Sequence, residues 1–202
     1  KLGIFEVLIY FMINIILFGK PGAGKGTQAE FLKKRFNLIH ISTGEIFRNN
    51  IKNKTKLGVL AKSFMDNGDL VPDNVTIKML KSEVKKSNSA NGFIFDGFPR
   101  TISQAEALDS FLESIKMEIT ATISLEVKEK ILEERLINRG KLSGRSDDQD
   151  IDKIKNRFKE YNIKTSQLKN YYKSKNKLYA VSGIGSIDQI KNRLIDLMNQ
   201  IK

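Results

Sequence analysis

Apolar and polar positions along the chain form two patterns: short apolar runs, and longer stretches with helical spacing between apolar residues. The short runs predict β-strands at 13–18, 38–41, 92–96, 120–125 and 177–181. The longer stretches predict helices at about 24–36, 43–52, 55–66, 73–87, 101–115, 127–138, 148–173 and 187–200. Alternating strands and helices indicate an α/β protein, in which a five-stranded parallel sheet lies between two layers of helices.

Two segments fit this alternation poorly. Residues 42–71 contain two short polar helices where a crossover normally carries one, and residues 139–146 form a short, glycine-rich basic loop between two helices. We expect both to be insertions over the ends of the strands, where α/β proteins bind their ligands.

The segment between the first strand and the first helix carries the strongest chemical signal. It reads Gly-Lys-Pro-Gly-Ala-Gly-Lys-Gly-Thr from Gly19 to Thr27. A glycine-rich turn between a strand and a helix lets backbone N–H groups point inward, while the helix start and Lys25 add positive charge. An ordinary strand-to-helix turn would not need four glycines and a lysine. The pattern therefore predicts a phosphate-binding loop for a nucleotide polyphosphate.

Composition restricts the remaining possibilities. The chain has 202 residues, no cysteine and one histidine, which excludes disulfides and cysteine- or histidine-based metal clusters such as zinc sites. A divalent cation would be held by carboxylates, phosphates and water, as Mg²⁺ prefers. The net charge of +12 could indicate a nucleic-acid partner. However, the lysines are spread over every helix without an aromatic-interleaved stripe, so we expect no nucleic-acid partner.

The first residues form an apolar run that Glu6 and Asn14 interrupt. This run is shorter than the ~20 residues that a membrane-spanning helix needs, which makes a membrane anchor the weaker alternative. A signal peptide would be cleaved where the phosphate loop begins, which would destroy the predicted site, so this interpretation is disfavoured. We expect residues 1–11 to be an extension and the functional domain to cover 12–202, beginning at Met12.

Two candidate motifs lie at the carboxyl end of the strand at 92–96. Asp96 ends this apolar strand, as a Walker-B aspartate near magnesium would, although a strand-end cap fits equally well. Arg100 follows at the strand end and suits bidentate phosphate binding. Thr101 and Gln104 have capping-box spacing, which local sequence favours. The Gln104 amide could instead bind an adenine base through paired hydrogen bonds.

Arginines are rare, and most of them lie near the motifs. Of the 35 basic residues, 27 are lysines and 8 are arginines. Six arginines lie on or beside the motif segments; they are Arg48, Arg100, Arg135, Arg139, Arg145 and Arg157. A guanidinium binds phosphate with a planar fork that an ammonium lacks. The arginine positions therefore predict a site for more phosphates than one nucleotide carries.

The motifs at 19–28, 41–48 and 96–101 together resemble nucleoside monophosphate kinases, and most closely the adenylate kinase family. The resemblance extends from Met12 to the C-terminus. It implies the reaction ATP + AMP ⇌ 2 ADP with Mg²⁺, on a P-loop core with an NMP-binding insert at 42–71 and a short lid at 139–146. It also implies a cytoplasmic monomer without zinc.

The resemblance also implies roles for individual residues. ATP would be held by Gly22, Ala23, Gly24, Lys25, Gly26, Thr27, Arg135, Arg139 and Gly185. AMP would be held by Thr43, Arg48, Asp69, Leu70, Val71, Gly97, Arg100, Gln104, Arg145 and Arg157. Lys25, Arg100, Arg139, Arg145 and Arg157 would be catalytic, and Asp96 would reach the metal through water. Gln104 then has a role in adenine recognition that is compatible with capping.

The chain departs from the family pattern at a few positions. Lys20 replaces a proline in the loop, and Gly26 displaces the hydroxyl of Thr27 from the usual magnesium-ligand position. The segment after Arg145 is one residue longer than usual, which makes Arg157 the less secure match. Two alternatives stay open: a UMP/CMP-type kinase, and a non-catalytic nucleic-acid-binding P-loop protein, which would leave the arginine positions unexplained.

Overall fold

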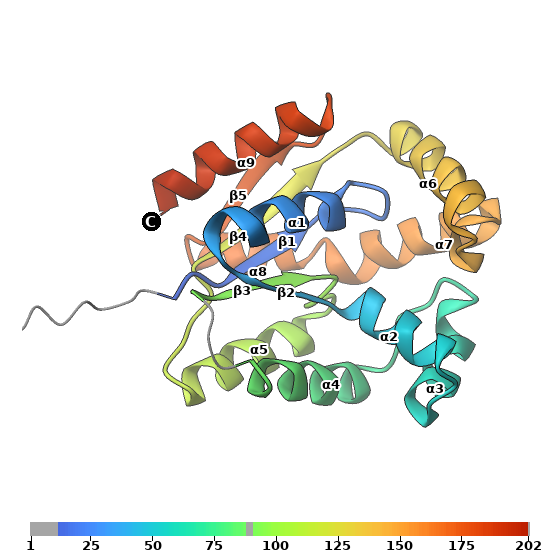
Figure 1. Cartoon of the computed structure of the whole chain (residues 1–202), viewed down its shortest axis with the longest axis horizontal. Coiled ribbons are helices and arrows are strands. Elements are labelled where there is room, and N and C mark those ends of the chain that lie inside the picture. The colour runs from blue at the N-terminus through green and yellow to red at the C-terminus, as the bar shows by residue number, and fades with distance from the viewer. Residues whose placement is uncertain (1–11, 88–90, 202) are drawn as a thin grey trace, which may run out of the picture.

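Five parallel strands form the centre of the molecule (Figure 1). The computed structural model describes residues 12–87 and 91–201, so the expected extension at 1–11 lies outside the described residues. The strands lie in the order β2-β3-β1-β4-β5. Their bounds are Ile15–Phe18 (β1), Ile39–Ser42 (β2), Phe93–Asp96 (β3), Ala121–Glu126 (β4) and Leu178–Ser182 (β5). The sequence placed all five within two residues, because strands buried on both faces are continuous apolar runs.

Helices cover both faces of this sheet (Figure 1). Helices α1 (Lys25–Phe36) and α9 (Ile187–Ile201) pack on one face, around a core that includes Leu32 and Leu194. Helices α4 (Asp73–Lys85), α5 (Ile102–Ser114) and α8 (Leu168–Ser174) pack on the other, around Phe95 and Tyr172. The predicted three-layer α/β/α architecture is confirmed.

Helices α2 (Thr43–Lys52) and α3 (Lys56–Met65) form the segment that the sequence singled out as an insertion. They have a small apolar core of their own, built on Phe47, Ala61, Val71 and Met79. Ser42 begins α2 as its N-cap, with its side chain accepting from the Glu45 N–H. The two helices follow directly from the carboxyl end of β2, beside the ends of the other strands.

The segment after β4 differs from the sequence-based expectation. Helix α6 runs from Glu129 to Ser143, five residues beyond its predicted end, so the first residues of the expected loop at 139–146 are helical. Gly140 does not end the helix; a Cβ there would lie 2.6 Å from the Asp148 carbonyl oxygen, so this glycine allows close packing instead. The helix ends at Gly144, whose φ of +66° is the left-handed conformation that glycine favours.

The long helix predicted at 148–173 is divided into shorter pieces. A 3₁₀ turn at Ser146–Asp148 precedes α7 (Ile151–Glu160), and a π-helical turn at Tyr161–Thr165 precedes α8. Asp150 caps α7 by accepting from the Asp152 N–H. Throughout the described ranges, no helix combines the length and apolar character needed to cross a bilayer.

Candidate active site

The turn between β1 and α1 contains a group of backbone donors that have no acceptor among the described residues. Helix α1 begins at Lys25 with no side-chain cap, and Gly24 before it adopts a φ of +92°. Five N–H groups at this turn find no hydrogen-bond acceptor among the described residues; they belong to Gly22, Gly24, Lys25, Gly26 and Thr27. Free N–H groups at a helix N-terminus form an anion site.

Lys25 lies across the opening of this loop. Its Nζ donates to the carbonyl oxygens of Gly19 at 2.7 Å and Lys20 at 3.2 Å. The pKa of Lys25 is lowered to about 8, mainly by burial; Asp96 opposes the shift, and the nearby guanidinium of Arg100 contributes to it. A buried ammonium among cations is stabilised when an anion binds beside it.

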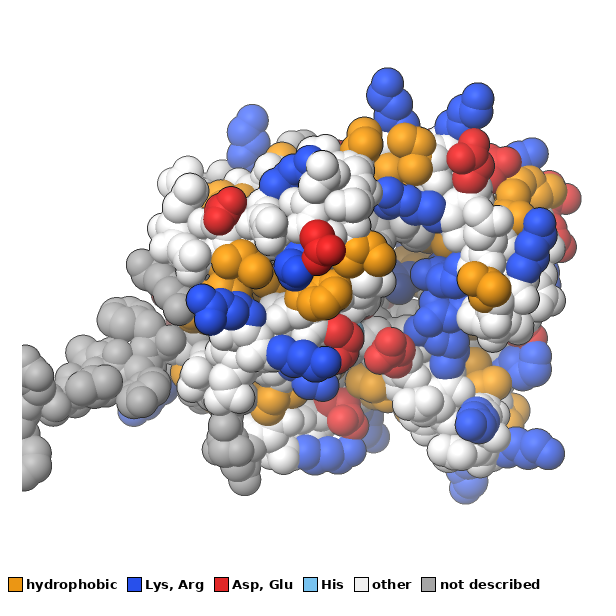
Figure 2. Space-filling view, turned by 45° about the horizontal axis from the view of Figure 1, so that its top comes forward, with side chains coloured by type: hydrophobic (Ala, Val, Ile, Leu, Met, Phe, Trp, Pro, Cys, Tyr) orange, Lys and Arg blue, Asp and Glu red, His pale blue; other side chains and the backbone are white. Residues whose placement is uncertain are grey.

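A cavity of about 450 Å³ opens in front of the loop and is lined by basic side chains. Figure 2 shows Lys and Arg side chains gathered in the hollow between the part carrying α6 and the part carrying α2 and α3. Besides Lys25, the lining cations are Arg48, Arg100, Arg139, Arg145 and Arg157. Five of the six arginines that the sequence singled out therefore meet at one cavity.

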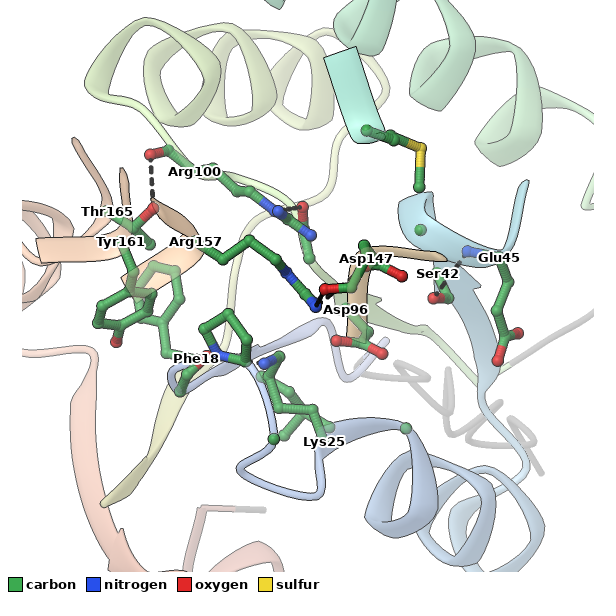
Figure 3. Close-up of a pocket in the computed structure, with 18 of the residues that line it drawn as sticks. Phe18, Lys25, Ser42, Glu45, Asp96, Arg100, Asp147, Arg157, Tyr161 and Thr165 are labelled. Atoms are coloured by element: carbon green, nitrogen blue, oxygen red, sulfur yellow. Dashed lines mark hydrogen bonds and ion pairs between the residues drawn. The ribbon is translucent and has the colours of Figure 1, made fainter. Parts of the chain in front are cut away.

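These guanidiniums lie close enough together to lower one another's pKa values. Burial, followed by the charge of Arg145, lowers the pKa of Arg48 to about 10. Burial and the neighbouring Arg157 also lower the pKa of Arg100. Figure 3 shows Arg100 and Arg157 side by side above Lys25. Each cation makes the next one less favourable, so the cavity strongly favours a polyanion.

Two aspartates partly neutralise the cavity, and sequence reasoning had not assigned them a role. The buried carboxylate of Asp148 accepts from Arg139 Nε at 2.6 Å, from Arg139 Nη2 at 3.0 Å and from Arg157 Nη1 at 2.5 Å. Asp147 Oδ2 lies 3.0 Å from Arg157 Nη1. These carboxylates orient two guanidiniums. The adjacent acidic pair was visible in the sequence, but its partners were not.

Asp96 ends β3 beside the loop, 3.8 Å from where a Cβ on Gly26 would lie. Its Oδ2 is 3.5 Å from Nε2 of the buried His40, on the neighbouring strand β2. Burial alone would raise the pKa of Asp96, but the close contact with His40 and the charge of Lys25 lower it. An ionised carboxylate at this position suits a hydrated Mg²⁺. Within the described part of the chain, no three His, Asp or Glu residues form a metal site.

A smaller recess of about 50 Å³ opens beside the main cavity. The sequence-predicted residues that line it are Thr43, Asp69, Leu70, Val71, Gly97, Arg100 and Gln104. Thr43 Oγ1 and Arg100 Nε both donate to the Gly97 carbonyl oxygen, at 2.9 and 2.8 Å. Gly97 has a φ of +75°, and a Cβ there would lie 2.9 Å from both side chains. The backbone at Gly97 therefore joins the insertion to the strand end.

Gln104 forms part of the capping arrangement that its spacing predicted. Its N–H donates to Thr101 Oγ1 at 3.2 Å, which caps α5. However, its side-chain Oε1 accepts from the Arg100 N–H at 2.8 Å, not from the Thr101 N–H that a capping box would use. The amide is buried at the edge of the recess, where both of its ends are held.

Three predicted residues lie outside the lining of both cavities. Ala23 belongs to the loop, but its side chain is buried. Arg135 points its guanidinium at the Gly183 carbonyl oxygen, with Nη2 at 3.2 Å. Gly185 lies in the exposed turn after β5 and has a φ of +120°. Arg135 thus contacts the turn that carries Gly185, next to the start of α9.

A parallel sheet, a phosphate loop before α1 and a cavity lined by cations define a P-loop nucleotide-binding protein. Comparison with known proteins narrows this class. A model of the adenylate kinase family matches residues 17–177. The chain is 64% identical over 190 residues to the adenylate kinase of Flavobacterium psychrophilum, covering 94% of this chain and 100% of the relative.

Two further adenylate kinases are also similar. The Flavobacterium johnsoniae protein is 60% identical over 94% of this chain and 100% of its own length. A Bacteroides fragilis protein is 46% identical over 89% of this chain and 94% of its own. The chain belongs to the adenylate kinase family. It is a nucleoside monophosphate kinase that transfers a phosphoryl group reversibly between ATP and AMP.

Proposed function

We propose that the loop side of the cavity binds ATP with Mg²⁺ and that the recess binds AMP. The ATP residues are Gly22, Ala23, Gly24, Lys25, Gly26, Thr27, Arg135, Arg139 and Gly185. The AMP residues are Thr43, Arg48, Asp69, Leu70, Val71, Gly97, Arg100, Gln104, Arg145 and Arg157. One observation carries this proposal: Lys25 and five arginines line a single cavity between a loop of free N–H donors and a recess.

The chemistry requires positioning and charge more than proton transfer. The AMP phosphate is already an anionic nucleophile, so no residue needs to act as a strong base. Arg100 lines both the cavity and the recess, which suits a group that holds the attacking phosphate. Lys25, Arg139, Arg145 and Arg157 would neutralise charge on the transferred phosphoryl group.

Asp148 keeps two of these arginines in place before substrates bind. Arg139 and Arg157 share its carboxylate, so both guanidiniums start with defined orientations. When phosphates enter, the N–H groups of each guanidinium that do not contact Asp148 can bind them, while the other N–H groups stay hydrogen-bonded to Asp148. This arrangement lowers the cost of ordering the arginines at the moment of binding.

Mg²⁺ would accompany ATP, and Asp96 is the residue we assign to it, through bound water. When bound, the ion would neutralise part of the negative charge of the ATP phosphates. The residue supports this role because its lowered pKa keeps the carboxylate ionised. His40 and Lys25 are the groups that hold it in that state.

We further propose that the insert at 42–71 closes over AMP and the lid at 139–146 closes over ATP. Ser146 Oγ of the lid donates to Asp66 Oδ1 of the insert at 3.0 Å. Next to the lid, Asn156 Nδ2 of α7 donates to the Asn67 carbonyl oxygen at 2.9 Å and to Asp69 Oδ1 at 3.0 Å. Closure would exclude water and bring the arginines together only when both substrates are bound. We also propose that the protein is a cytoplasmic monomer without nucleic-acid or membrane partners. The absence of cysteine bears on the first part of this proposal only, because it suits a reducing compartment.

Replacing Arg157 with lysine tests the assignment. Arg157→Lys keeps the charge but loses the planar fork that contacts Asp147 and Asp148, so we expect kcat to fall by about 10²-fold or more. Arg35→Lys, an exposed change on α1, is the matched control and should retain wild-type kcat. If Arg157→Lys keeps kcat within a few-fold of wild type, Arg157 does not contact the transferred phosphoryl group.

A further inference from the structure

The side-chain amide of Gln104 is held from both ends by groups of fixed hydrogen-bonding type. Its Oε1 accepts from the Arg100 backbone N–H at 2.8 Å, and its Nε2 donates to Asp73 Oδ1 at 2.7 Å. A backbone N–H can only donate, and a carboxylate can only accept. Rotating the amide by 180° would place like groups together at both contacts, so only one orientation is allowed.

Asp73 is itself fixed in position. It is the first residue of α4, where the helix N-terminus favours a negative charge. Its second oxygen, Oδ2, accepts from Thr101 Oγ1 at 2.6 Å, and Thr101 Oγ1 in turn accepts from the Gln104 N–H. Asp73, Thr101 and Gln104 therefore form a closed ring of hydrogen bonds between the starts of α4 and α5.

The fixed amide still has one lone pair and one N–H for a ligand. Gln104 lines the recess, whereas Asp73 does not. An adenine base presents an amine that donates and a ring nitrogen, N1, that accepts, which matches the free lone pair and N–H. A 6-oxopurine such as hypoxanthine presents the reverse pattern, an accepting oxygen and a donating N1–H. It would need the rotated amide.

We propose that Asp73 is a positioning residue that sets acceptor specificity, by holding the Gln104 amide in the orientation that binds a 6-aminopurine and rejects a 6-oxopurine. This inference rests on the proposed role of Gln104 in binding the AMP base. Asp73 acts without touching the substrate. Its carboxylate charge matters because an asparagine amide could turn, and it would then accept from Gln104 in one orientation and donate to it in the other.

The test compares AMP and inosine monophosphate as phosphoryl acceptors from MgATP. For Asp73→Asn, we expect the ratio of kcat/KM for AMP to kcat/KM for inosine monophosphate to fall about tenfold or more, since a charge-assisted contact that enforces one orientation is lost. Asp109→Asn is the matched control. Asp109 also accepts from two side chains, Tyr171 and Lys175, but it lies outside both cavity linings, so its variant should keep the wild-type ratio.

Gln104→Ala separates this proposal from the one it rests on. If Gln104→Ala lowers the ratio but Asp73→Asn leaves it at the wild-type value, Asp73 does not set the orientation. A uniform loss for both acceptors in Asp73→Asn, together with a lower melting temperature, would equally overturn the proposal, because it would mean that Asp73 only stabilises α4. If Gln104→Ala also leaves the ratio unchanged, Gln104 does not bind the base, and the proposed AMP site fails as well.

Discussion

At the scale of single residues, the site consists of charges that the folded chain holds at a cost. Lys25 is the clearest example, because burial, with a smaller contribution from the surrounding arginines, lowers its pKa to about 8. Arg48, with a pKa of about 10, shares this crowding. Bound phosphates would reverse both effects, so substrate binding and protonation of Lys25 are linked.

This linkage predicts that ATP affinity depends on pH. The ligand-free protein loses the Lys25 proton above about pH 8, whereas the phosphate-bound lysine keeps it, so binding takes up a proton as the pH rises. The dissociation constant for ATP should therefore be about tenfold larger at pH 9 than at pH 7, which means weaker binding at the higher pH. Calorimetry in buffers of different ionisation enthalpy measures both the affinity and the proton uptake. Constant affinity from pH 7 to 9 without proton uptake would contradict the assigned role of Lys25.

At the scale of elements, the proposed AMP insert depends on a close contact between two short helices. A Cβ on Gly58 of α3 would lie 2.1 Å from the Asn50 carbonyl oxygen of α2, and backbone atoms cannot move aside easily. Glycine is needed at this position because of the close approach of the two helices. The small core of Phe47 and Ala61 beneath this contact keeps Thr43 and Arg48 facing the cavities.

Gly58→Ala should therefore separate α2 from α3. We expect a loss of about 1–3 kcal/mol in the free energy of unfolding, as overpacked sites show, and a melting temperature lower by several degrees. The KM for AMP should rise about tenfold, with little change in the KM for ATP, whose phosphate loop is on another element. Ser63→Ala, an exposed change on the same helix, is the control. Equal increases in both KM values would mean that α2 and α3 do not form the AMP side of the site.

The elements also show how far the sequence alone could lead. The strands and the phosphate loop were predictable, because apolar runs and a glycine pattern are local signals. The end of α6 was not predictable. Gly140 allows the backbone of Asp148 to pack closely against α6, and this contact exists only in the folded chain. The hydrogen bond from Gln104 to Asp73 likewise joins residues on two different helices, so no local sequence pattern indicated it.

At the scale of the whole molecule, we propose that catalysis depends on closure of the insert at 42–71 and the lid at 139–146, which touch through Ser146 and Asp66. Ser146 with Asp66 and Asn156 with Asp69 are polar, exposed contacts, which can break and form again easily. We expect the positive charge of the cavity to attract the anionic substrates, and opening of the segments to release two charged products. We therefore expect lid motion, not phosphoryl transfer, to limit turnover.

Solvent viscosity tests this expectation. The kcat of the wild-type enzyme should be inversely proportional to relative viscosity when sucrose is added, because a large segment must move through solvent. The Arg157→Lys variant provides an internal control: its slow chemical step should make kcat insensitive to viscosity. A wild-type kcat that is independent of viscosity would show that lid opening does not limit the rate.

The most direct measurement is a coupled assay for ADP formation from MgATP with AMP, CMP, UMP and GMP offered separately as acceptors. The fold, the cation-lined cavity and the Gln104 recess together predict a strong preference for AMP. Preference for CMP or UMP would leave the fold intact but contradict the acceptor we assign to the recess. No ADP formation with any of the four would contradict the central claim, that this cavity catalyses phosphoryl transfer between ATP and AMP.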